Sequence, residues 1–531
     1  MNRREYGWLV RLSLTILCVF LVSSTTVGAT MGAGDDEFGP IEQVTVAFDG
    51  NQPNDMSLWF SLSEDGRFVA FGSYASNLVI GDTNDYQDVF VRDRQSGVTE
   101  RVSVRNNGSE GYPRSMNNVG MFPAISADGR FVAFTSVADL VEGLQHNGPD
   151  VFLRDRTDGV TELISVSSDG IQANGWSSEP AISADGRFVA FSSHGNNLIA
   201  IDRNSTSDVF LRDRLGMITE RITVGYSGED SNGPSYGTIA ITPDGRFIAF
   251  TSRASNIVEN DTNQYDDVFV WDGMSRTTER VSISTTGQQA NNWSMNPSIS
   301  ADGRFIAFMS EASNLVENDT NQVWDVFVHD RQSRQTERVS ISSSGEQAPR
   351  GYWSSHPSIS GDGRYVAFRS GAGNLVPGDR GGWDVFIRDR IEYKTVLASQ
   401  VDMNNPVDHS DMYPAITSDG RYVAFDTAAV LVAGDSNGDR DIFIRATPFR
   451  PKMTFEALCD LSRSLVSKPG IGSSLCAKLH AASEAQKRWQ LDVRRHVLTA
   501  FEHQVKAQIG KALTLEEASQ LLDGVRELQG P

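Results

Sequence analysis

The heptapeptide DGRFVAF at residues 65–71 decides the fold of this 531-residue chain, because it returns six more times in nearly the same form. Some of the later copies carry Ile in place of Val, or Tyr in place of Phe. They begin at Asp128, Asp185, Asp244, Asp302, Asp362 and Asp419, so that successive copies lie 57 to 63 residues apart. A period of this length is typical of solenoids, propellers and other repeat architectures.

Each repeat carries the same succession of short apolar runs and turns. In the second copy, residues 123–126 precede the Asp-Gly-Arg turn, and residues 131–136, 150–155 and 161–166 follow it. The runs are rich in Val, Ile, Phe and Thr, and Gly, Asp and Asn separate them, which predicts four antiparallel strands. The Phe-Val-Ala-Phe segment of the second run is apolar at every position, as a strand covered on both faces must be. The repeat is therefore predicted to be one blade of a propeller.

The two ends of the repeat region complement each other. The seventh copy stops at Thr447-Pro448 without a fourth strand, whereas IEQVTV at residues 41–46 matches the fourth run of other copies, such as TERVSV at residues 99–104. We therefore predict that the N-terminal strand closes the last blade and leaves no open sheet edge. The predicted fold is mainly β, a seven-bladed propeller of four-stranded antiparallel blades over residues 41–447.

These repeats resemble the TolB-like propeller repeat, a relative of the WD-repeat blade. The hallmark is a P-x-x-S-x-D-G-x-x-[IVL]-A-F run followed by a D-[IV]-[FY]-[VIL] strand, and only Phe60 and Ile239 replace its proline in copies one and four. The resemblance covers about 400 residues. It implies the fold, but it implies little about function, since propellers host enzymes, ligand binders and scaffolds.

The N-terminal residues have the pattern of an export signal. Arg3, Arg4 and Arg11 precede an apolar run at residues 12–22, and small residues end at Ala29, where we expect cleavage. Eleven apolar residues are short for a membrane span, which needs about 20; an uncleaved anchor is the alternative. Residues 1–29 are thus predicted to be a signal peptide, residues 30–40 a linker, and the mature protein secreted, periplasmic or at the cell surface.

After Pro451 the apolar residues recur with a helical period, which predicts a small all-α bundle at residues 454–531 behind a linker at residues 448–453. Gly470 and Gly510 are expected to end helices, and Thr514 opens a capping box. The apolar positions are Leu458, Leu461, Leu465, Leu475, Leu479, Ala482, Val493, Val497, Phe501, Val505, Leu521, Leu522, Val525 and Leu528.

This tail resembles the FIMAH domain, found at the C-termini of exported bacterial proteins, on the runs at residues 470–479, 500–508 and 510–511. The resemblance implies an extracytoplasmic, modular protein and no particular activity.

Cys18 lies inside the predicted signal. Cys459 and Cys476 are left to form either a disulfide or two buried free thiols.

The net charge of −21 belongs to the repeats, because the residues from Pro451 onward hold 11 Lys and Arg against 9 Asp and Glu. An acidic propeller lacks the basic footprint that nucleic acids and anionic lipids need, so neither is expected as a partner. After signal cleavage, no membrane span is expected either.

Five repeats carry an Asp-x-Asn-x-x-x-Asp pattern in the loop before the third strand. Oxygen ligands at positions 1, 3 and 7 are what a hard cation such as Ca²⁺ requires. The alternative is ordinary turn structure, because Asp-x-Asn also caps backbone amides and none of these loops ends in the glutamate of an EF-hand. No cofactor is required on either reading. The residues are Asp82, Asn84, Asp88, Asp202, Asn204, Asp208, Asp261, Asn263, Asp267, Asp319, Asn321, Asp325, Asp435, Asn437 and Asp441.

Aromatic residues recur before the first strand of the repeats, on the side of the long loops. Rings beside amide and hydroxyl groups suit stacking on sugars or gripping peptides; the alternative is that each ring fills the gap between blades. The candidate ligand-binding residues are Trp176, Tyr236, Trp293, Trp353 and Tyr413.

Catalytic motifs are lacking in the sequence: it has no G-x-S-x-G, H-E-x-x-H or C-x-x-C. The recurrent Glu-Arg pairs, such as Glu100-Arg101, are expected to be ion pairs at blade edges.

The first hypothesis is an exported, non-enzymatic binding or scaffold propeller that recognises a protein or glycan through its long-loop face, stabilised or not by calcium. The alternatives are an extracellular polysaccharide-active enzyme with carboxylates in the central channel, and a structural part of a cell-surface assembly.

Overall fold

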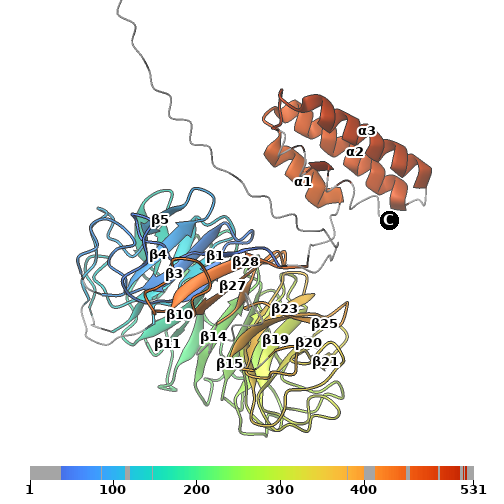
Figure 1. The fold of residues 1–531 in the computed structure, drawn as a ribbon. Helices are drawn as coiled ribbons and strands as arrows, with labels where there is room; N and C mark the ends of the chain where they lie inside the picture. Colours follow the sequence, from blue (N-terminus) through green and yellow to red (C-terminus); the bar gives the residue numbers. More distant parts are fainter. Residues whose placement is uncertain are drawn as a thin grey trace, which may run out of the picture. The chain divides into compact units, whose positions relative to one another are not determined.

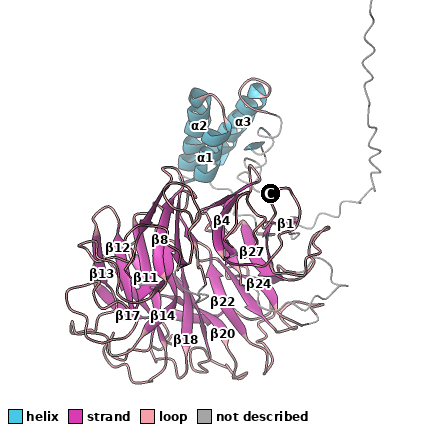
Figure 2. Cartoon of the chain, turned by 90° about the vertical axis from the view of Figure 1, so that its left-hand side faces the viewer, coloured by secondary structure: helices cyan, strands magenta, loops and turns pink. Residues whose placement is uncertain are grey.

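The computed structural model describes residues 38–84, 86–113, 120–145, 148–379, 381–399, 413–449, 455–487 and 491–514, together with Ala518, Leu521, Leu522 and Val525. Within these residues the strands form seven four-stranded antiparallel sheets (Figures 1 and 2). First strands of neighbouring blades contact one another, and the first strand of blade one, β2, contacts the seventh blade. The prediction of a mainly β, seven-bladed propeller followed by helices is confirmed.

Six blades use four consecutive strands each, and the seventh uses three strands and β1. Blade one contains β2 (Ser57–Leu62), β3 (Phe68–Ser73), β4 (Asp88–Asp93) and β5 (Val98–Arg101). Blade two contains β6 (Ala124–Ile125), β7 (Phe131–Ser136), β8 (Asp150–Asp155) and β9 (Val160–Leu163). Blade three contains β10 (Ser177–Ile182), β11 (Phe188–Ser193), β12 (Asp208–Asp213) and β13 (Ile218–Arg221). Blade four contains β14 (Ser235–Ile241), β15 (Phe247–Ser252), β16 (Asp267–Asp272) and β17 (Thr277–Arg280). Blade five contains β18 (Ser294–Ile299), β19 (Phe305–Ser310), β20 (Asp325–Asp330) and β21 (Gln335–Arg338). Blade six contains β22 (Ser354–Ile359), β23 (Tyr365–Ser370), β24 (Asp384–Asp389) and β25 (Lys394–Leu397). Blade seven is β26 (Ala415–Ile416), β27 (Tyr422–Thr427), β28 (Asp441–Ala446) and β1 (Ile41–Gln43).

Closure by the N-terminal strand is confirmed by the pairing of β1 with β28. Ile41 lies opposite Arg445 and Gln43 opposite Phe443, and Figure 1 shows the two strands side by side. The regular strand is shorter than the predicted residues 41–46, although the Val44 amide still donates to the Ile442 carbonyl at 2.8 Å. The last blade therefore has no open edge on this side.

The last residue of the repeated heptapeptide builds the core of each blade. Phe71 packs on Phe90 of the third strand with ring centroids 5.8 Å apart, and the equivalent pair recurs in all seven blades at up to 6.4 Å. The flanking Val69 and Ala70 are also fully buried. Burial of each phenylalanine contributes about 2 to 3 kcal/mol, so the stability of the propeller is spread over its repeats.

The Asp-Gly-Arg turn connects the first and second strands. In the second blade the Asp128 carboxylate accepts the Arg130 amide at 2.9 Å, and Gly129 has a φ of 74°. A Cβ atom at Gly129 would lie 2.2 Å from the ring of Phe68 in the preceding blade. The turn thus needs glycine for its backbone and for its contact with the neighbouring blade.

Arginines join successive blades along the same edge. Arg94 of blade one binds Glu42 of blade seven at 2.6 Å, donates to the Gly66 carbonyl at 2.7 Å and covers the ring of Tyr422. The predicted ion pairs at blade edges are confirmed in this form, between blades rather than within the Glu-Arg dipeptides. Other pairs of this kind are Arg156–Glu100, Arg214–Glu162, Arg276–Glu220, Arg331–Glu279 and Arg390–Glu337.

Strand order assigns the loops to two faces. The Asp-Gly-Arg turns and the turns between third and fourth strands lie on one face, here called the tight-turn face. The loops between second and third strands, and those that lead to the next blade, lie on the opposite, long-loop face. The longer connections are the usual place for binding residues.

The C-terminal part contains α1 (Phe455–Leu465), α2 (Pro469–Lys487) and α3 (Leu491–Gln508), and the described residues between Ala518 and Val525 are helical too. Gly510 has a φ of 73° and follows α3, as expected for a helix end. The prediction that Gly470 ends a helix is wrong, because α2 begins at Pro469, where proline suits a first helical turn. The core of the bundle includes Leu475, Leu479 and Phe501.

Candidate functional site

The five Asp-x-Asn loops differ in what faces their carboxylates. In blade one, Nη1 of Arg101 lies 2.9 Å from Asp82 and 3.1 Å from Asp88. Asn84 donates to Asp88 at 2.9 Å. The predicted oxygen atoms at positions 1 and 7 do converge, and a guanidinium from the fourth strand lies between them.

The same arrangement recurs in three other blades. Arg221 lies 3.3 and 3.4 Å from Asp202 and Asp208, Arg280 lies 3.0 and 3.2 Å from Asp261 and Asp267, and Arg338 lies 3.1 and 3.2 Å from Asp319 and Asp325. In each loop the Asn204, Asn263 or Asn321 amide donates to the last carboxylate. In these four blades the arginine supplies the positive charge that the two carboxylates need.

Burial dominates the electrostatics of these loops. It raises the pKa of Asp82 to about 6, to which the charge of Asp88 adds and which Arg101 opposes. Burial also raises the pKa of Asp267 to about 6, against the opposing effect of Arg280. The guanidinium therefore offsets only part of the cost of burying two carboxylates.

The remaining three blades lack the arginine. At its register, opposite the third-strand phenylalanine, they carry Leu163, Leu397 and Gln43. In blade two the loop pattern is absent as well, and in blade six burial raises the pKa of Asp384 to about 6. Blade seven keeps Asp435, Asn437 and Asp441 beside the neutral Gln43. Burial raises the pKa of Asp441 to about 6, and the charge of Asp435 adds to that shift.

The predicted aromatic residues are partly exposed at the long-loop face. Trp176, Trp293, Trp353 and Tyr236 are 51, 41, 44 and 37% exposed. The Tyr236 hydroxyl donates to the Asp266 carboxylate at 2.6 Å, and this hydrogen bond fixes the orientation of the ring. With these exposed fractions, the three tryptophans and Tyr236 are not fully buried between neighbouring blades.

Two further tryptophans, which the sequence reasoning missed, extend this set. Trp324 lies parallel to Trp293 with ring centroids 6.5 Å apart, and Tyr265 meets Trp293 edge-on at 5.7 Å. Trp383 packs on Trp353 at 5.2 Å. Both missed residues directly precede the first aspartate of a third strand, and this shared position was the signal that could have found them.

The innermost strands share a bulge that the sequence did not indicate. Trp59, Glu179, Asn296 and His356 have φ between 45° and 56°, just where the pairing with the second strand shifts. Bulges re-aim side chains and are frequent next to binding sites. Contacts link this position from blade to blade: Trp59 with Phe122 at 5.2 Å, and His356 with Tyr413 at 4.6 Å.

Glu179 is the carboxylate at this inner position among the described residues. Burial raises its pKa, against hydrogen bonds from the Gly237 backbone and the Ser192 side chain. The candidate Tyr413 belongs to this inner set rather than to the exposed tryptophans. The backbone amide of Glu179 donates to Oγ1 of Thr135 in the neighbouring blade at 3.3 Å.

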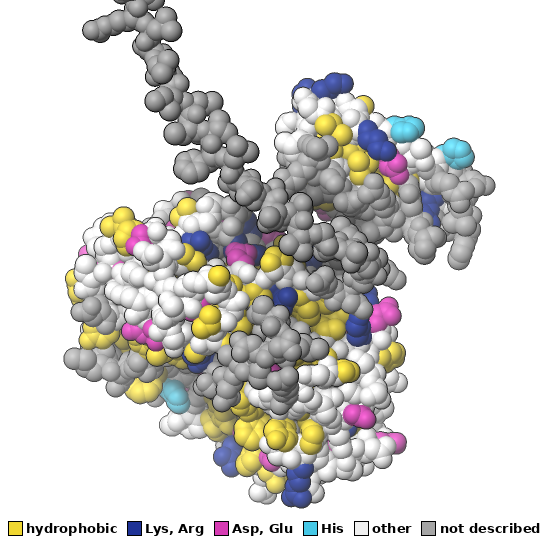
Figure 3. Space-filling model, in the orientation of Figure 1, with side chains coloured by type: hydrophobic (Ala, Val, Ile, Leu, Met, Phe, Trp, Pro, Cys, Tyr) yellow, Lys and Arg dark blue, Asp and Glu magenta, His cyan; other side chains and the backbone are white. Residues whose placement is uncertain are grey.

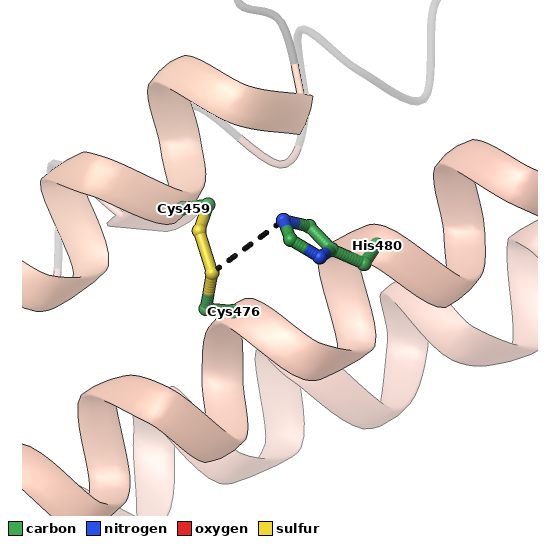
Figure 4. Close-up of side chains that lie close together, drawn as sticks. All are labelled: Cys459, Cys476 and His480. Carbon is green, nitrogen blue, oxygen red and sulfur yellow. Dashed lines mark hydrogen bonds between the residues drawn. A yellow bond between two sulfur atoms is a disulfide. The ribbon is translucent and has the colours of Figure 1, made fainter.

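The two cysteines of the tail form a disulfide between α1 and α2, with Cα atoms 4.5 Å apart. His480 points toward it, with Nε2 3.8 Å from Sγ of Cys476 (Figure 4). The structure therefore selects the disulfide over the two free thiols. While the sulfurs are bonded to each other, this group of three has no thiolate to offer a metal.

In the view of Figure 3, the hydrophobic side chains on the surface of the propeller form several separate groups and not one continuous apolar patch. No helix within the described part of the chain is both long and apolar enough to cross a bilayer.

The fold is that of a seven-bladed propeller, and comparison with known proteins adds likeness in fold only. Among solved structures, an oligogalacturonate lyase in complex with manganese is 11% identical over 78% of this chain and 98% of its own, with a TM-score of 0.45. A putative TolB from Agrobacterium tumefaciens is 18% identical over 62% of this chain and 90% of its own, with a TM-score of 0.33. No family model and no curated protein matches the sequence.

Proposed function

We propose that the protein is an exported, non-enzymatic binding or scaffold protein whose propeller recognises a protein or a glycan through the long-loop face. The observation that carries this proposal is the set of partly exposed indoles, Trp176, Trp293 and Trp353, at that face. An indole offers a flat apolar surface and an N–H donor, which suits stacking on a sugar ring or holding an extended peptide. Asn and Ser side chains beside the rings can bind hydroxyl or amide groups.

A location outside the cytoplasm is part of the same proposal. It is supported by the apolar run at residues 12–22 behind Arg3 and Arg4, and by the likeness of the tail to the FIMAH domain. The Cys459–Cys476 disulfide fits an oxidising compartment. The acidic charge of the repeats continues to argue against nucleic acid as a partner.

The test is a ligand screen with the mature chain, residues 30–531, on a glycan array and by pull-down from native envelope proteins. The double variant Trp293→Ala/Trp353→Ala is expected to lose about tenfold in affinity, since each stacked ring contributes about 0.5 to 1.5 kcal/mol. Tyr393→Ala, which removes an exposed ring from the tight-turn face, is the matched control. Equal loss in both variants, or full binding by the double variant, contradicts the proposal.

Glu179 supports the second candidate, an enzyme acting on an extracellular polysaccharide from the central channel. A turnover screen on plant and bacterial glycans distinguishes the two, because product release that disappears in Glu179→Gln favours the enzyme. Binding without product favours the first proposal. Stable co-purification with envelope proteins, without either, indicates a structural part of a cell-surface assembly.

A further inference from the structure

The loop before the third strand of blade seven keeps the oxygen ligands of its four counterparts and lacks their arginine. In blades one, three, four and five a guanidinium nitrogen lies between the first and last carboxylates at 2.9 to 3.4 Å. Gln43 takes the corresponding register in blade seven, opposite Phe443, just as Arg101 lies opposite Phe90. Four internal copies thus show the same ligand set around a positive group.

The negative charge of the blade-seven loop has little to balance it. Asp441 is fully buried and Asp435 is 7% exposed. Asp441 accepts from Thr45 at 2.6 Å and from Asn437 at 3.2 Å, both neutral donors. The Leu431 backbone interacts with the Asp435 carboxyl. No side chain in the described part of the chain forms a hydrogen bond or an ion pair with the Asp435 carboxyl.

Nearby groups do not supply the missing charge. Gln43 exchanges hydrogen bonds with Gln52 at 2.8 and 3.1 Å, and an amide is neutral in any case. Arg440, the adjacent cation, binds Asp426 at 2.8 Å. The loop also has a carboxylate at position 5, Asp439, where the other four loops have Tyr86, Thr206, Tyr265 and Val323.

We propose that a divalent cation of the calcium class binds in blade seven at the place that arginine takes in the other four blades. Carboxylate oxygens, here at positions 1, 5 and 7, are donors that Ca²⁺ prefers, whereas soft metals favour sulfur and nitrogen. Asp435 and Asp441 hold the ion, and Asp439 adds a third carboxylate to the loop. Asn437 orders the loop, because its oxygen accepts from the Asp439 amide and its nitrogen donates to Asp441. The proposal does not depend on what the long-loop face binds.

The position of this loop gives the ion a role in ring closure. Asp441 begins β28, the strand that pairs with β1, and its carboxylate accepts a hydrogen bond from Thr45, two residues after the end of β1. A cation that neutralises Asp435 and Asp441 stabilises the junction between the first and last strands of the propeller. By mass action, the folded ring then gains stability with calcium concentration.

The experiment uses the full chain, freed of metal by chelation and then titrated calorimetrically with CaCl2, and with MgCl2 as a comparison. We expect one calcium ion per chain and a melting temperature that rises with calcium concentration. Gln43→Arg restores the repeat's own arginine, so it should abolish the calcium site and make the melt independent of chelator, at a temperature above that of the chelated wild type.

Two further variants keep the result interpretable. Asp435→Asn should weaken calcium binding at least tenfold. Asp319→Asn, in the arginine-held loop of blade five, should leave the stoichiometry and affinity of calcium unchanged. The proposal is overturned if millimolar calcium gives neither heat nor a shift in melting temperature in the wild type, or if Gln43→Arg binds calcium as the wild type does.

Discussion

At the residue scale, the glycine of the Asp-Gly-Arg turn illustrates how one position serves two blades. Gly129→Ala places a Cβ on a backbone with φ of 74° and 2.2 Å from the Phe68 ring. We expect a loss of about 3 kcal/mol in the free energy of unfolding, combining left-handed strain with overpacking, measurable by urea denaturation. Gly143→Ala has a similar φ of 82° with no neighbour within 4 Å and should cost only about 1 kcal/mol. Equal losses would show that the contact between blades contributes nothing.

His329 takes a position in the third strand where five other blades have an arginine and blade four has Trp271. Its Nδ1 lies 2.9 Å from Oγ1 of Thr336, as Nη1 of Arg92 lies 3.0 Å from Oγ1 of Thr99. Burial lowers the pKa of His329 to about 4. The other residues at this position include Arg154, Arg212 and Arg388.

The low pKa predicts a pH dependence of stability with a defined sign. Because the folded pKa lies below the unfolded value of about 6.5, the stability is fully present above pH 6.5 and is lost as pH falls toward 4. By pH 4 the loss should reach about 3 kcal/mol. His329→Arg should remove this component from denaturation curves between pH 7 and 4, and His194→Gln, at an exposed site, should retain it. A wild-type slope in His329→Arg would contradict the assignment.

At the element scale, the phenylalanine pairs between second and third strands are the repeated unit of the core. Phe308→Ala removes a fully buried ring whose centroid lies 6.0 Å from that of Phe327. We expect a loss of 3 to 5 kcal/mol, about the usual value for such a cavity, measured by denaturant unfolding. Phe48→Ala, at a ring that is largely exposed, should cost less than about 1 kcal/mol. Comparable losses at both sites would argue against the pair as a core element.

The sequence predicts elements well where one residue type has one role. DGRFVAF marks a turn and a buried strand in every repeat, so the number of blades follows from it, and ring closure follows from the match of residues 41–46 to the fourth run of the repeat. It does not reveal Arg101 between Asp82 and Asp88, because that contact depends on the register of Phe90 with Arg101 across two strands. The bulges at Trp59 and Glu179 are likewise hidden, since nothing in these residue types favours a positive φ. Gly470 misleads, because the preceding Pro469 begins a helix.

At the scale of the whole molecule, closure of the ring depends on a strand separated by some 400 residues from its partner. Deletion of residues 41–48 removes β1 and exposes the edge of β28. We expect the melting temperature of the propeller to fall by 10 °C or more, an order-of-magnitude value for losing a strand that buries Val44 and bonds through Thr45. Scanning calorimetry measures this, with deletion of residues 30–37 as control. An unchanged melt would show that the ring does not need the strand.

The pairing of β1 with β28 also fixes how the propeller responds to tension. Gly39 and Ala446 are joined by a backbone hydrogen bond, so the chain enters and leaves the seventh blade at the same end of the strand pair. A pull between the N-terminal flank and the C-terminal tail loads the hydrogen bonds of this pair one after another, and it peels the strands apart instead of shearing them together. The closure of the ring therefore resists such a pull with only one hydrogen bond at a time.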